Sequence, residues 1–212
     1  MPTSPSRPRN AAATREAILD SAIRSFARAG YDGVGVREIA RDAGVTAMLV
    51  NRYFGSKEQL FAEAVEASFA APVFIAEQSQ SFARETAAAL VARSARGGDE
   101  LTPFLIMLRS VSNPRSDEIV TGAIERHVGR RLARQLPAPG RQLRSDVVLS
   151  VISGVLLMRR VASTRALNGR DADQLTDILE AMFDAVVQTP LESVSRRGRA
   201  RRRRDRGSTD GK

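Results

Sequence analysis

The 212-residue sequence predicts an all-α fold of about nine helices, and three observations lead to this prediction. Apolar residues recur at i, i+3, i+4 and i+7, as at Leu19, Ala22, Ile23 and Phe26, which is the spacing of an amphipathic helix. Proline and glycine interrupt this pattern at intervals that suit helix ends. No segment alternates apolar and polar residues for long enough to require a strand.

We predict four regions along the chain. Residues 1–12 are rich in proline, serine and arginine and are expected to be a disordered arm. Residues 13–56 hold three helices, and residues 57–190 hold the remaining ones. Residues 191–212 are arginine-rich and of low complexity, so that we expect a disordered tail.

Composition excludes several kinds of protein and site. The chain has no cysteine, which excludes disulfides, thiolate chemistry and a cysteine-ligated zinc site. No run approaches the roughly 18 consecutive apolar residues of a membrane-spanning helix. The polar first ten residues lack the apolar core of a signal peptide. We therefore expect a soluble, cytoplasmic protein.

The sequence offers little for catalysis. His127 is the single histidine, and a lone histidine without a second ligand at helical spacing is poor evidence for a metal or catalytic site. Glycine-rich phosphate loops and the patterns HExxH and GxSxG are absent from the sequence. We therefore expect no enzyme activity, no cofactor and no metal.

The net charge of +9 comes from the two ends of the chain. Residues 196–212 hold nine basic residues and two aspartates, and residues 1–15 hold three arginines and no acidic residue. Residues 16–195 are close to neutral. The net positive charge of the chain therefore does not indicate a basic surface on the folded part.

Residues 36–54 have the pattern of a helix-turn-helix. Ala40 is small where two helices must touch, and Gly44 follows where a tight turn needs a positive φ. An ordinary αα-hairpin is the alternative, but the whole pattern favours a second helix that enters the major groove of DNA. The apolar residues at inward positions are Ile39, Ala43, Val45, Val50 and Tyr53.

Beyond this motif the sequence predicts further helices with short breaks. Ser56 begins a capping box, in which Gln59 bonds back to the Ser56 amide, and Pro72 breaks or bends this helix. Asn113-Pro114 is read as another break. Residues 73–95 are predicted to form one helix or two shorter ones, and the later helices are predicted over about residues 101–111, 117–136, 142–167 and 171–188.

The last two predicted helices carry apolar residues over more of their surface than the single stripe of an amphipathic helix. Such a wide apolar surface suggests that each helix is buried on two sides, one within the subunit and one against a second copy. A wholly intramolecular core is the alternative. Ser150 and Gly154 are small enough to let another helix approach closely. The candidate dimer-interface residues are Val147, Val151, Gly154, Met158, Leu175, Ile178 and Met182.

Three stretches of the chain resemble the TetR family of transcriptional regulators. They are residues 14–31 (TREAILDSAIRSFARAGY), 36–45 (VREIARDAGV) and 51–61 (NRYFGSKEQLF), which have the family's spacing. In the rest of the chain the resemblance is one of layout only, short helices followed by two long ones.

The resemblance implies a homodimeric repressor whose N-terminal domains occupy successive major grooves of a palindromic operator. The C-terminal domain would hold the dimer interface and a pocket for a small molecule. Ligand binding would move the fourth helix and change the separation of the two DNA-reading heads. This separation matters because adjacent major grooves on one face of DNA lie about 34–36 Å apart.

The resemblance also indicates which residues contact DNA. Tyr53 and Lys57 match the family's usual phosphate contacts, although core packing is an equal alternative for Tyr53. Thr46 is expected to cap the second helix, and Met48 lies at its leading end, where apolar side chains meet thymine methyl groups. The candidate DNA-binding residues are Arg37, Thr46, Ala47, Met48, Asn51, Arg52, Tyr53 and Lys57.

Two positions depart from the family pattern. Asn51 stands where the family often has tyrosine, and asparagine can make a bidentate contact with adenine. Gly35 replaces a common threonine, so that a capping hydroxyl is absent. An alternative function is that of a nucleoid-type protein, which would bind DNA without sequence choice through the arginine-rich tail.

A pocket for an effector should be mostly apolar with a few polar groups. Arg109 could meet an anionic ligand or pair with Asp117 or Glu118. Aromatic residues are few in this region, which argues against a planar, stacked ligand; repression without an effector is the alternative. The candidate residues for a small apolar effector are Phe82, Phe104, Met107, Leu108, Val151 and Val155.

Overall fold

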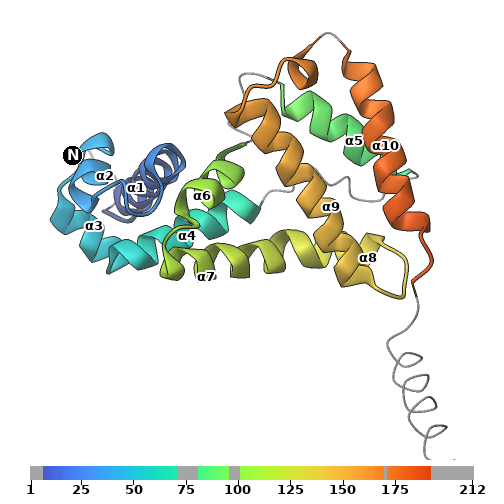
Figure 1. The fold of residues 1–212 in the computed structure, drawn as a ribbon. Helices are drawn as coiled ribbons and strands as arrows, with labels where there is room; N and C mark the ends of the chain where they lie inside the picture. Colours follow the sequence, from blue (N-terminus) through green and yellow to red (C-terminus); the bar gives the residue numbers. More distant parts are fainter. Residues whose placement is uncertain (1–6, 71–80, 96–100, 170, 192–212) are drawn as a thin grey trace, which may run out of the picture. The chain divides into compact units, whose positions relative to one another are not determined.

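The computed structural model describes residues 7–70, 81–95, 101–169 and 171–191, which form helices and connecting turns without a strand (Figure 1). The all-α prediction is confirmed. The chain forms two compact units, residues 1–73 with 93–128 and residues 74–92 with 129–212. The first unit extends past residue 56, the predicted domain boundary, because later helices share a core with the helix-turn-helix.

The first helix, α1 (Arg7–Ala29), begins earlier than the sequence suggested. We expected residues 7–12 to belong to a disordered arm, but they form its first turns. Pro8 stands at the second position, where its missing N–H leaves no intrahelical bond unmade, and residues 11–13 are alanines, the best helix formers. Residues 1–6 of the predicted arm lie outside the described residues.

The helix-turn-helix consists of α2 (Val36–Asp42) and α3 (Ala47–Phe54), which confirms the prediction. Gly44, in the turn, has φ +70°, and a Cβ there would meet no atom within 4 Å. The backbone conformation alone therefore favours glycine. The residues buried or half-buried in one core with α1 are Ile39, Ala40, Ala43, Val45, Val50 and Tyr53.

Helix α4 (Lys57–Ala70) begins with half of the predicted capping box. The Ser56 hydroxyl accepts a hydrogen bond from the Gln59 N–H at 3.1 Å. The Ser56 N–H donates to the Phe54 carbonyl at 2.9 Å and not to Gln59, because the tight turn at Gly55 brings that carbonyl within reach. Pro72, the predicted end of this helix, lies outside the described residues.

Asn113-Pro114 begins a helix instead of breaking the chain. The Asn113 carboxamide oxygen accepts hydrogen bonds from the N–H groups of Arg115 and Ser116, at 3.0 and 3.3 Å, and Pro114 occupies the first helical position. Helix α7 (Pro114–Ala123) continues through the π-helical segment η2 (Ile124–Gly129) into α8 (Arg130–Gln135). We expected this helix to begin three residues later, near Asp117.

Helix α6 (Thr102–Ser110) packs closely on the end of α1. Gly30 has φ +73°, and a Cβ there would overlap the main-chain carbonyl of Arg109. The Arg109 guanidinium donates to the Ala27 carbonyl near the end of α1. Neither interpretation of Arg109 from the sequence anticipated this bond, because only the fold brings residues 27 and 109 together.

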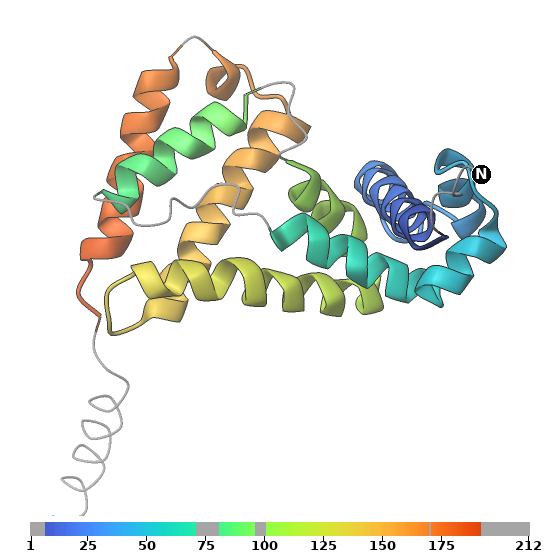
Figure 2. The same ribbon diagram turned by 180° about the vertical axis from the view of Figure 1, so that it is seen from behind.

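The second unit contains α5 (Phe82–Arg93), α8 (Arg130–Gln135), α9 (Arg141–Leu156) and α10 (Ala172–Gln188). Helix α5 lies beside α10 (Figure 1 and Figure 2). The rings of Phe82 and Phe183 are 6.5 Å apart, and Arg84 pairs with Asp177 and Glu180 at 3.0 and 2.7 Å. These contacts join α5 to α10.

Helix α9 is shorter than the predicted 142–167. It passes into a π-helical segment, η3 (Leu157–Val161), and the chain then turns at Ser163, where φ is +52°. Both the N–H and the hydroxyl of Thr164 donate to the Met158 carbonyl, at 3.0 and 3.1 Å. Adjacent serine and threonine offer the backbone an alternative to the helical hydrogen bond, which ends the helix here.

Two buried arginines satisfy carbonyls near the ends of helices in the second unit. Arg144 donates to the Val186 carbonyl and, at 2.6 Å, to the Thr189 carbonyl at the end of α10. Arg159 donates to the Val91 carbonyl of α5 at 2.9 Å. A cation near the carboxyl end of a helix is favourable because the helix dipole is negative there.

Candidate nucleic-acid interface

Helix α3 has one anchored side and one exposed side. The Thr46 hydroxyl accepts a hydrogen bond from the Leu49 N–H at 3.3 Å, which confirms the predicted N-cap. Val50 and Phe54 are buried in the core. Asn51 and Arg52 are exposed on the other side. The fold therefore fixes the helix while leaving these polar side chains able to reach a partner.

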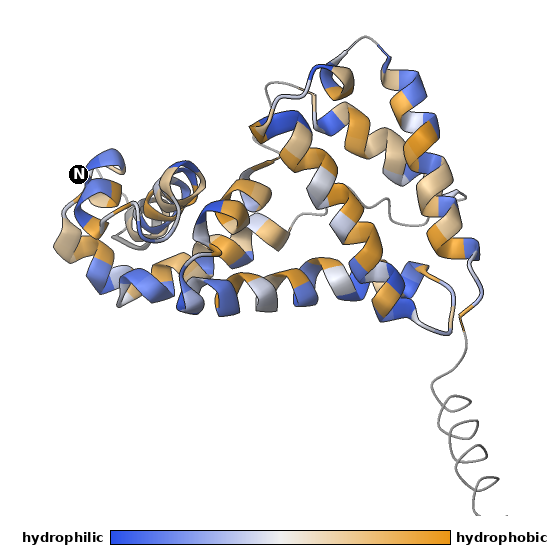
Figure 3. Ribbon diagram, viewed as in Figure 1, coloured by the Kyte–Doolittle hydropathy of each residue, from blue (hydrophilic) through white to orange (hydrophobic). Residues whose placement is uncertain are grey.

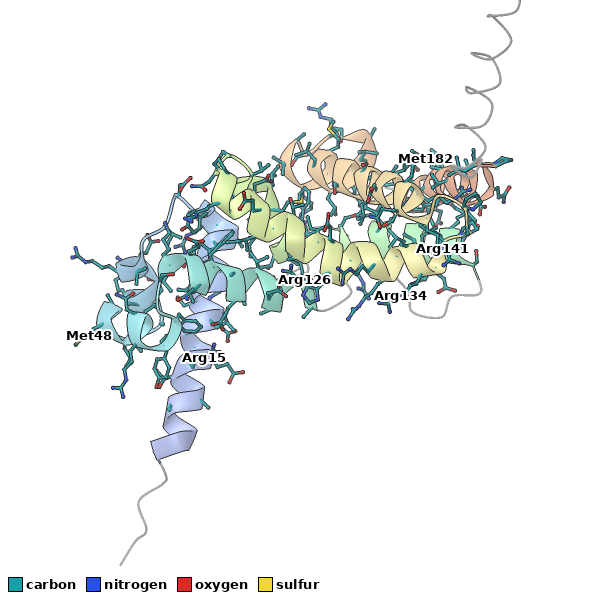
Figure 4. All side chains as sticks on the ribbon, turned by 90° about the horizontal axis from the view of Figure 1, so that it is seen from below. Arg15, Met48, Arg126, Arg134, Arg141 and Met182 are labelled. Atoms are coloured by element: carbon teal, nitrogen blue, oxygen red, sulfur yellow. The ribbon has the colours of Figure 1, made fainter. Side chains whose placement is uncertain are left out.

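Met48 is the most exposed large apolar side chain of the described residues, at 80%. It projects outward from the start of α3 (Figure 4), beside the half-buried Ala47. Burying a methionine side chain stabilises a fold by about 1.5–3 kcal/mol relative to leaving it exposed, and Met48 does not contribute this stabilisation here. An apolar surface of this kind suits contact with a thymine methyl group in the major groove.

The acidic side chains of α2 are paired with α1. The Arg28 guanidinium lies 2.7 Å from the Glu38 carboxylate and 3.7 Å from that of Asp42, while Arg37 is exposed. This pairing reduces the repulsion that the two carboxylates would exert on a phosphate backbone. The sequence pattern did not indicate this pairing, because only the fold brings α1 and α2 together.

Lys57, the first residue of α4, lies against an aromatic side chain. Its ammonium nitrogen is 4.5 Å from the centroid of the Tyr31 ring, and both residues are half-buried. Burial raises the pKa of Tyr31, with smaller contributions from the nearby carboxylates of Glu58 and Asp32. The sequence pattern did not indicate the contact between Tyr31 and Lys57, because only the fold brings these two residues together.

Tyr53 is half-buried and packs against the core, so that the packing role considered from the sequence is confirmed. Its contact with phosphate stays a prediction.

Arg15 of α1 contacts both α3 and α4. Its guanidinium lies 4.6 Å from the centroid of the Phe54 ring and pairs with the Glu63 carboxylate. These contacts of α1 hold α3 and α4 together.

The candidate effector residues fall in both compact units. Those of the first unit, all on α6, are the buried Phe104 and the half-buried Met107 and Leu108. Those of the second unit, all half-buried, are Phe82, Val151 and Val155. Each unit therefore contains three of these apolar residues, and their role in ligand binding stays a prediction.

Apolar residues recur along α9 and α10 (Figure 3), and several of the large ones are exposed; we call these exposed residues the apolar face of α9 and α10. Gly154 lies on it, and a Cβ there would meet no atom within 4 Å, which leaves space for a closely packed helix. Val151 and Leu175 are half-buried. The exposed members named from the sequence are Val147, Met158, Ile178 and Met182. Sequence reasoning missed two further exposed apolar residues, Leu143 of α9 and Leu157 of η3.

The single histidine pairs with a carboxylate within the first unit. His127, in η2, contacts Glu66 of α4, which also pairs with Arg126. Among the described residues, no group of three or more histidine, cysteine, aspartate or glutamate side chains could hold a metal ion. No described helix is long and apolar enough to cross a membrane.

A helix-turn-helix whose second helix has one side in the core and one side exposed, followed by further helices, is typical of a class of DNA-binding regulators. The family model of bacterial regulatory proteins of the tetR family matches residues 18–64, and that of the tetracyclin repressor-like C-terminal domain matches residues 80–187. The chain therefore belongs to the TetR family of transcriptional regulators, as its sequence resemblance predicted.

Two curated relatives are transcriptional regulators. BetI of Agrobacterium fabrum is 29% identical over 141 residues, which cover 65% of this chain and 63% of BetI. RaaS of Mycobacterium tuberculosis is 37% identical over 102 residues, which cover 42% of this chain and 48% of RaaS. The chain thus spans less than two thirds of the length of either relative.

Solved structures show the same fold at low sequence identity. A TetR-family transcriptional regulator from Rhodococcus sp. has a TM-score of 0.62 and 15% identity, covering 82% of this chain and 98% of that one. The multidrug binding protein EbrR, complexed with ethidium, has a TM-score of 0.61 and 19% identity, covering 83% of this chain and 99% of that one.

Proposed function

We propose that this TetR-family regulator is a repressor that binds a palindromic operator as a homodimer and releases it when a small apolar effector binds. The exposed face of α3 carries this proposal. Met48 offers an apolar contact at the leading end of the helix, and Asn51 offers a carboxamide one turn later. A core-anchored helix with such a face is suited to the major groove.

Base contacts and phosphate contacts have separate residues in this proposal. Met48 and Asn51 read base edges, with Ala47 beside them. Arg37, Arg52 and Lys57 hold the phosphate backbone, which fixes the register of the helix without reading sequence. Thr46 and Tyr53 combine a structural role with a phosphate contact.

The exposed apolar face of α9 and α10 supports the homodimer. Isolated exposed apolar residues need no explanation, but several large ones on two neighbouring helices favour an interaction surface. A second copy of the same face would cover it under twofold symmetry. Twofold symmetry in the protein requires inverted symmetry in the DNA site.

The apolar candidate residues of α5 and α9, which lie in the same unit, support a small apolar effector. Phe82, Val151 and Val155 are apolar and half-buried, which is the character of residues that line ligand pockets. EbrR, which shares the fold, is a multidrug binding protein and has been solved in complex with ethidium. A thermal-shift screen of apolar compounds would detect an effector as a raised midpoint, because a ligand that binds only the folded state stabilises it.

Selection of bound sequences from random duplex DNA tests the proposal as a whole. A homodimer is expected to enrich an inverted repeat whose half-sites are centred about 10 base pairs, or a multiple, apart. Enrichment of no motif would contradict sequence-specific binding. In that case binding that falls steeply with salt would favour the nonspecific alternative through the arginine-rich tail.

A further inference from the structure

We propose that Tyr31 is a positioning residue for DNA binding, whose ring holds the Lys57 ammonium where it meets a phosphate. The proposal rests on the proposed contact between Lys57 and DNA. It adds a residue that lies in the turn after α1, away from both helices of the helix-turn-helix motif.

The geometry is that of a cation held on an aromatic face. The Lys57 nitrogen lies 4.5 Å from the centroid of the Tyr31 ring, within the roughly 6 Å over which the ring attracts a cation. A lysine side chain rotates about four bonds, and it loses much of this rotamer freedom when its ammonium group is fixed on a ligand. A ring that restricts Lys57 before DNA arrives therefore reduces the entropy lost on binding.

The ring itself is held in place by three helices. It packs edge-on against Phe61 of α4, with centroids 4.9 Å apart, and lies 6.4 Å from the Phe26 ring of α1. The Tyr31 N–H donates to the Ser110 hydroxyl of α6 at 3.2 Å. The next residue, Asp32, accepts a hydrogen bond from the Asn113 carboxamide at 2.9 Å. Tyr31 is therefore a fixed platform and not a mobile surface side chain.

The charge of Lys57 remains available for a phosphate. Among the described residues Lys57 forms no ion pair with a carboxylate. Its neighbour Glu58 lies 3.5 Å from Arg115 of α7. An aromatic ring restricts the ammonium without neutralising it, whereas a carboxylate would compete with the phosphate.

A double-mutant cycle on the full chain tests this role, with a duplex obtained by the selection above as the probe. Tyr31→Leu removes the aromatic face, Tyr31→Phe retains it, and Lys57→Ala removes the cation. We expect Tyr31→Leu to weaken binding roughly two- to fivefold per chain, an effect that is squared in a homodimer, and Tyr31→Phe to retain wild-type affinity. In the Lys57→Ala background, Tyr31→Leu should have no further effect.

Salt dependence and a control separate positioning from a structural role. Lys57→Ala should reduce the slope of log K against log salt by about 0.9 per chain, and Tyr31→Leu should move the slope in the same direction. In an Arg52→Ala background, Tyr31→Leu should keep its full effect, because these sites are independent. Tyr31→Met, which preserves apolar volume, replaces Tyr31→Leu if that variant does not melt cooperatively.

Two outcomes would overturn the inference, and they are distinguishable. If Lys57→Ala leaves affinity unchanged, the proposed contact of Lys57 with DNA is wrong. If Lys57→Ala weakens binding, but Tyr31→Leu weakens it by the same factor in the Lys57→Ala background as in the wild type, the Lys57 contact stands and the positioning role of Tyr31 is wrong.

Discussion

Replacing Gly30 with alanine should destabilise the first unit far more than the same replacement at Gly44. The two glycines have nearly the same backbone conformation, with φ +73° and +70°. Their surroundings differ, because a Cβ at Gly44 would meet no atom within 4 Å, whereas one at Gly30 would overlap the Arg109 carbonyl. The pair therefore separates the backbone cost from the cost of close packing.

The expected magnitudes follow from these two terms. An alanine held at positive φ costs about 1–2 kcal/mol, which is the whole effect at Gly44. At Gly30 the overlap with backbone atoms cannot be relieved by turning a side chain, so that α6 must move away from α1. Overpacking of this kind adds about 1–3 kcal/mol, giving about 2–5 kcal/mol in total.

Urea unfolding of the two variants and the wild type, at one protein concentration, measures the difference. The midpoint should fall in both variants and fall further for Gly30→Ala, while the dependence of free energy on urea stays constant. Equal destabilisation by the two substitutions would refute the close approach of α6 to α1. Loss of cooperative unfolding in Gly30→Ala alone would agree with it.

Three further predictions concern DNA binding, assembly and pH. Arg52→Ala should weaken operator binding and reduce the salt slope by about 0.9 per chain, as measured by fluorescence anisotropy, and should leave the thermal midpoint unchanged because Arg52 is exposed. Ile178→Asp should lower the mass measured by light scattering from that of the proposed homodimer to that of a monomer, because Ile178 of α10 is 59% exposed. The hydrogen bond from His127, followed by that from Arg126, lowers the pKa of Glu66 from its ordinary 4.5. Glu66 should therefore stabilise the fold above pH 4.5, and the advantage over Glu66→Gln should disappear as pH falls through the lowered pKa.

Each of these predictions has a control or a contrary result. Unchanged DNA affinity and unchanged salt slope in Arg52→Ala would contradict the proposed docking face. Ala88→Asp, which adds the same charge to an exposed position of α5, should leave the oligomeric state unchanged. A difference in stability between wild type and Glu66→Gln that stays constant from pH 7 to pH 3 would show that the Glu66 carboxylate has no preferential stabilising contact in the fold.

The parts of the fold that depend on local pattern could be predicted from the sequence. The positions of Ala40, Gly44 and Val50 follow from helical spacing and from the φ that a tight turn requires, and the structure confirms them. The cap at Thr46 is equally local. Asn113-Pro114 shows the limit of such reasoning, because the same dipeptide can end one helix or begin the next.

The contacts that position the site are non-local and could not be predicted. Tyr31 meets Lys57 because α1 packs against α4, and Arg109 meets Ala27 because α6 packs against α1. No periodicity within one helix encodes these pairs. The family resemblance supplied the DNA-binding candidates, but the exposure of Met48 and the pairing of Glu38 with Arg28 required the fold.

Selection from random duplex DNA, performed in parallel on the full chain and on a chain lacking residues 196–212, tests the central claim most directly. If the helix-turn-helix reads DNA as a homodimer, both chains will enrich the same inverted repeat, and the tail will change only affinity and its salt dependence. If the shortened chain enriches no motif and only the full chain binds, in a salt-sensitive manner, the tail is the DNA-binding element and the repressor proposal is wrong.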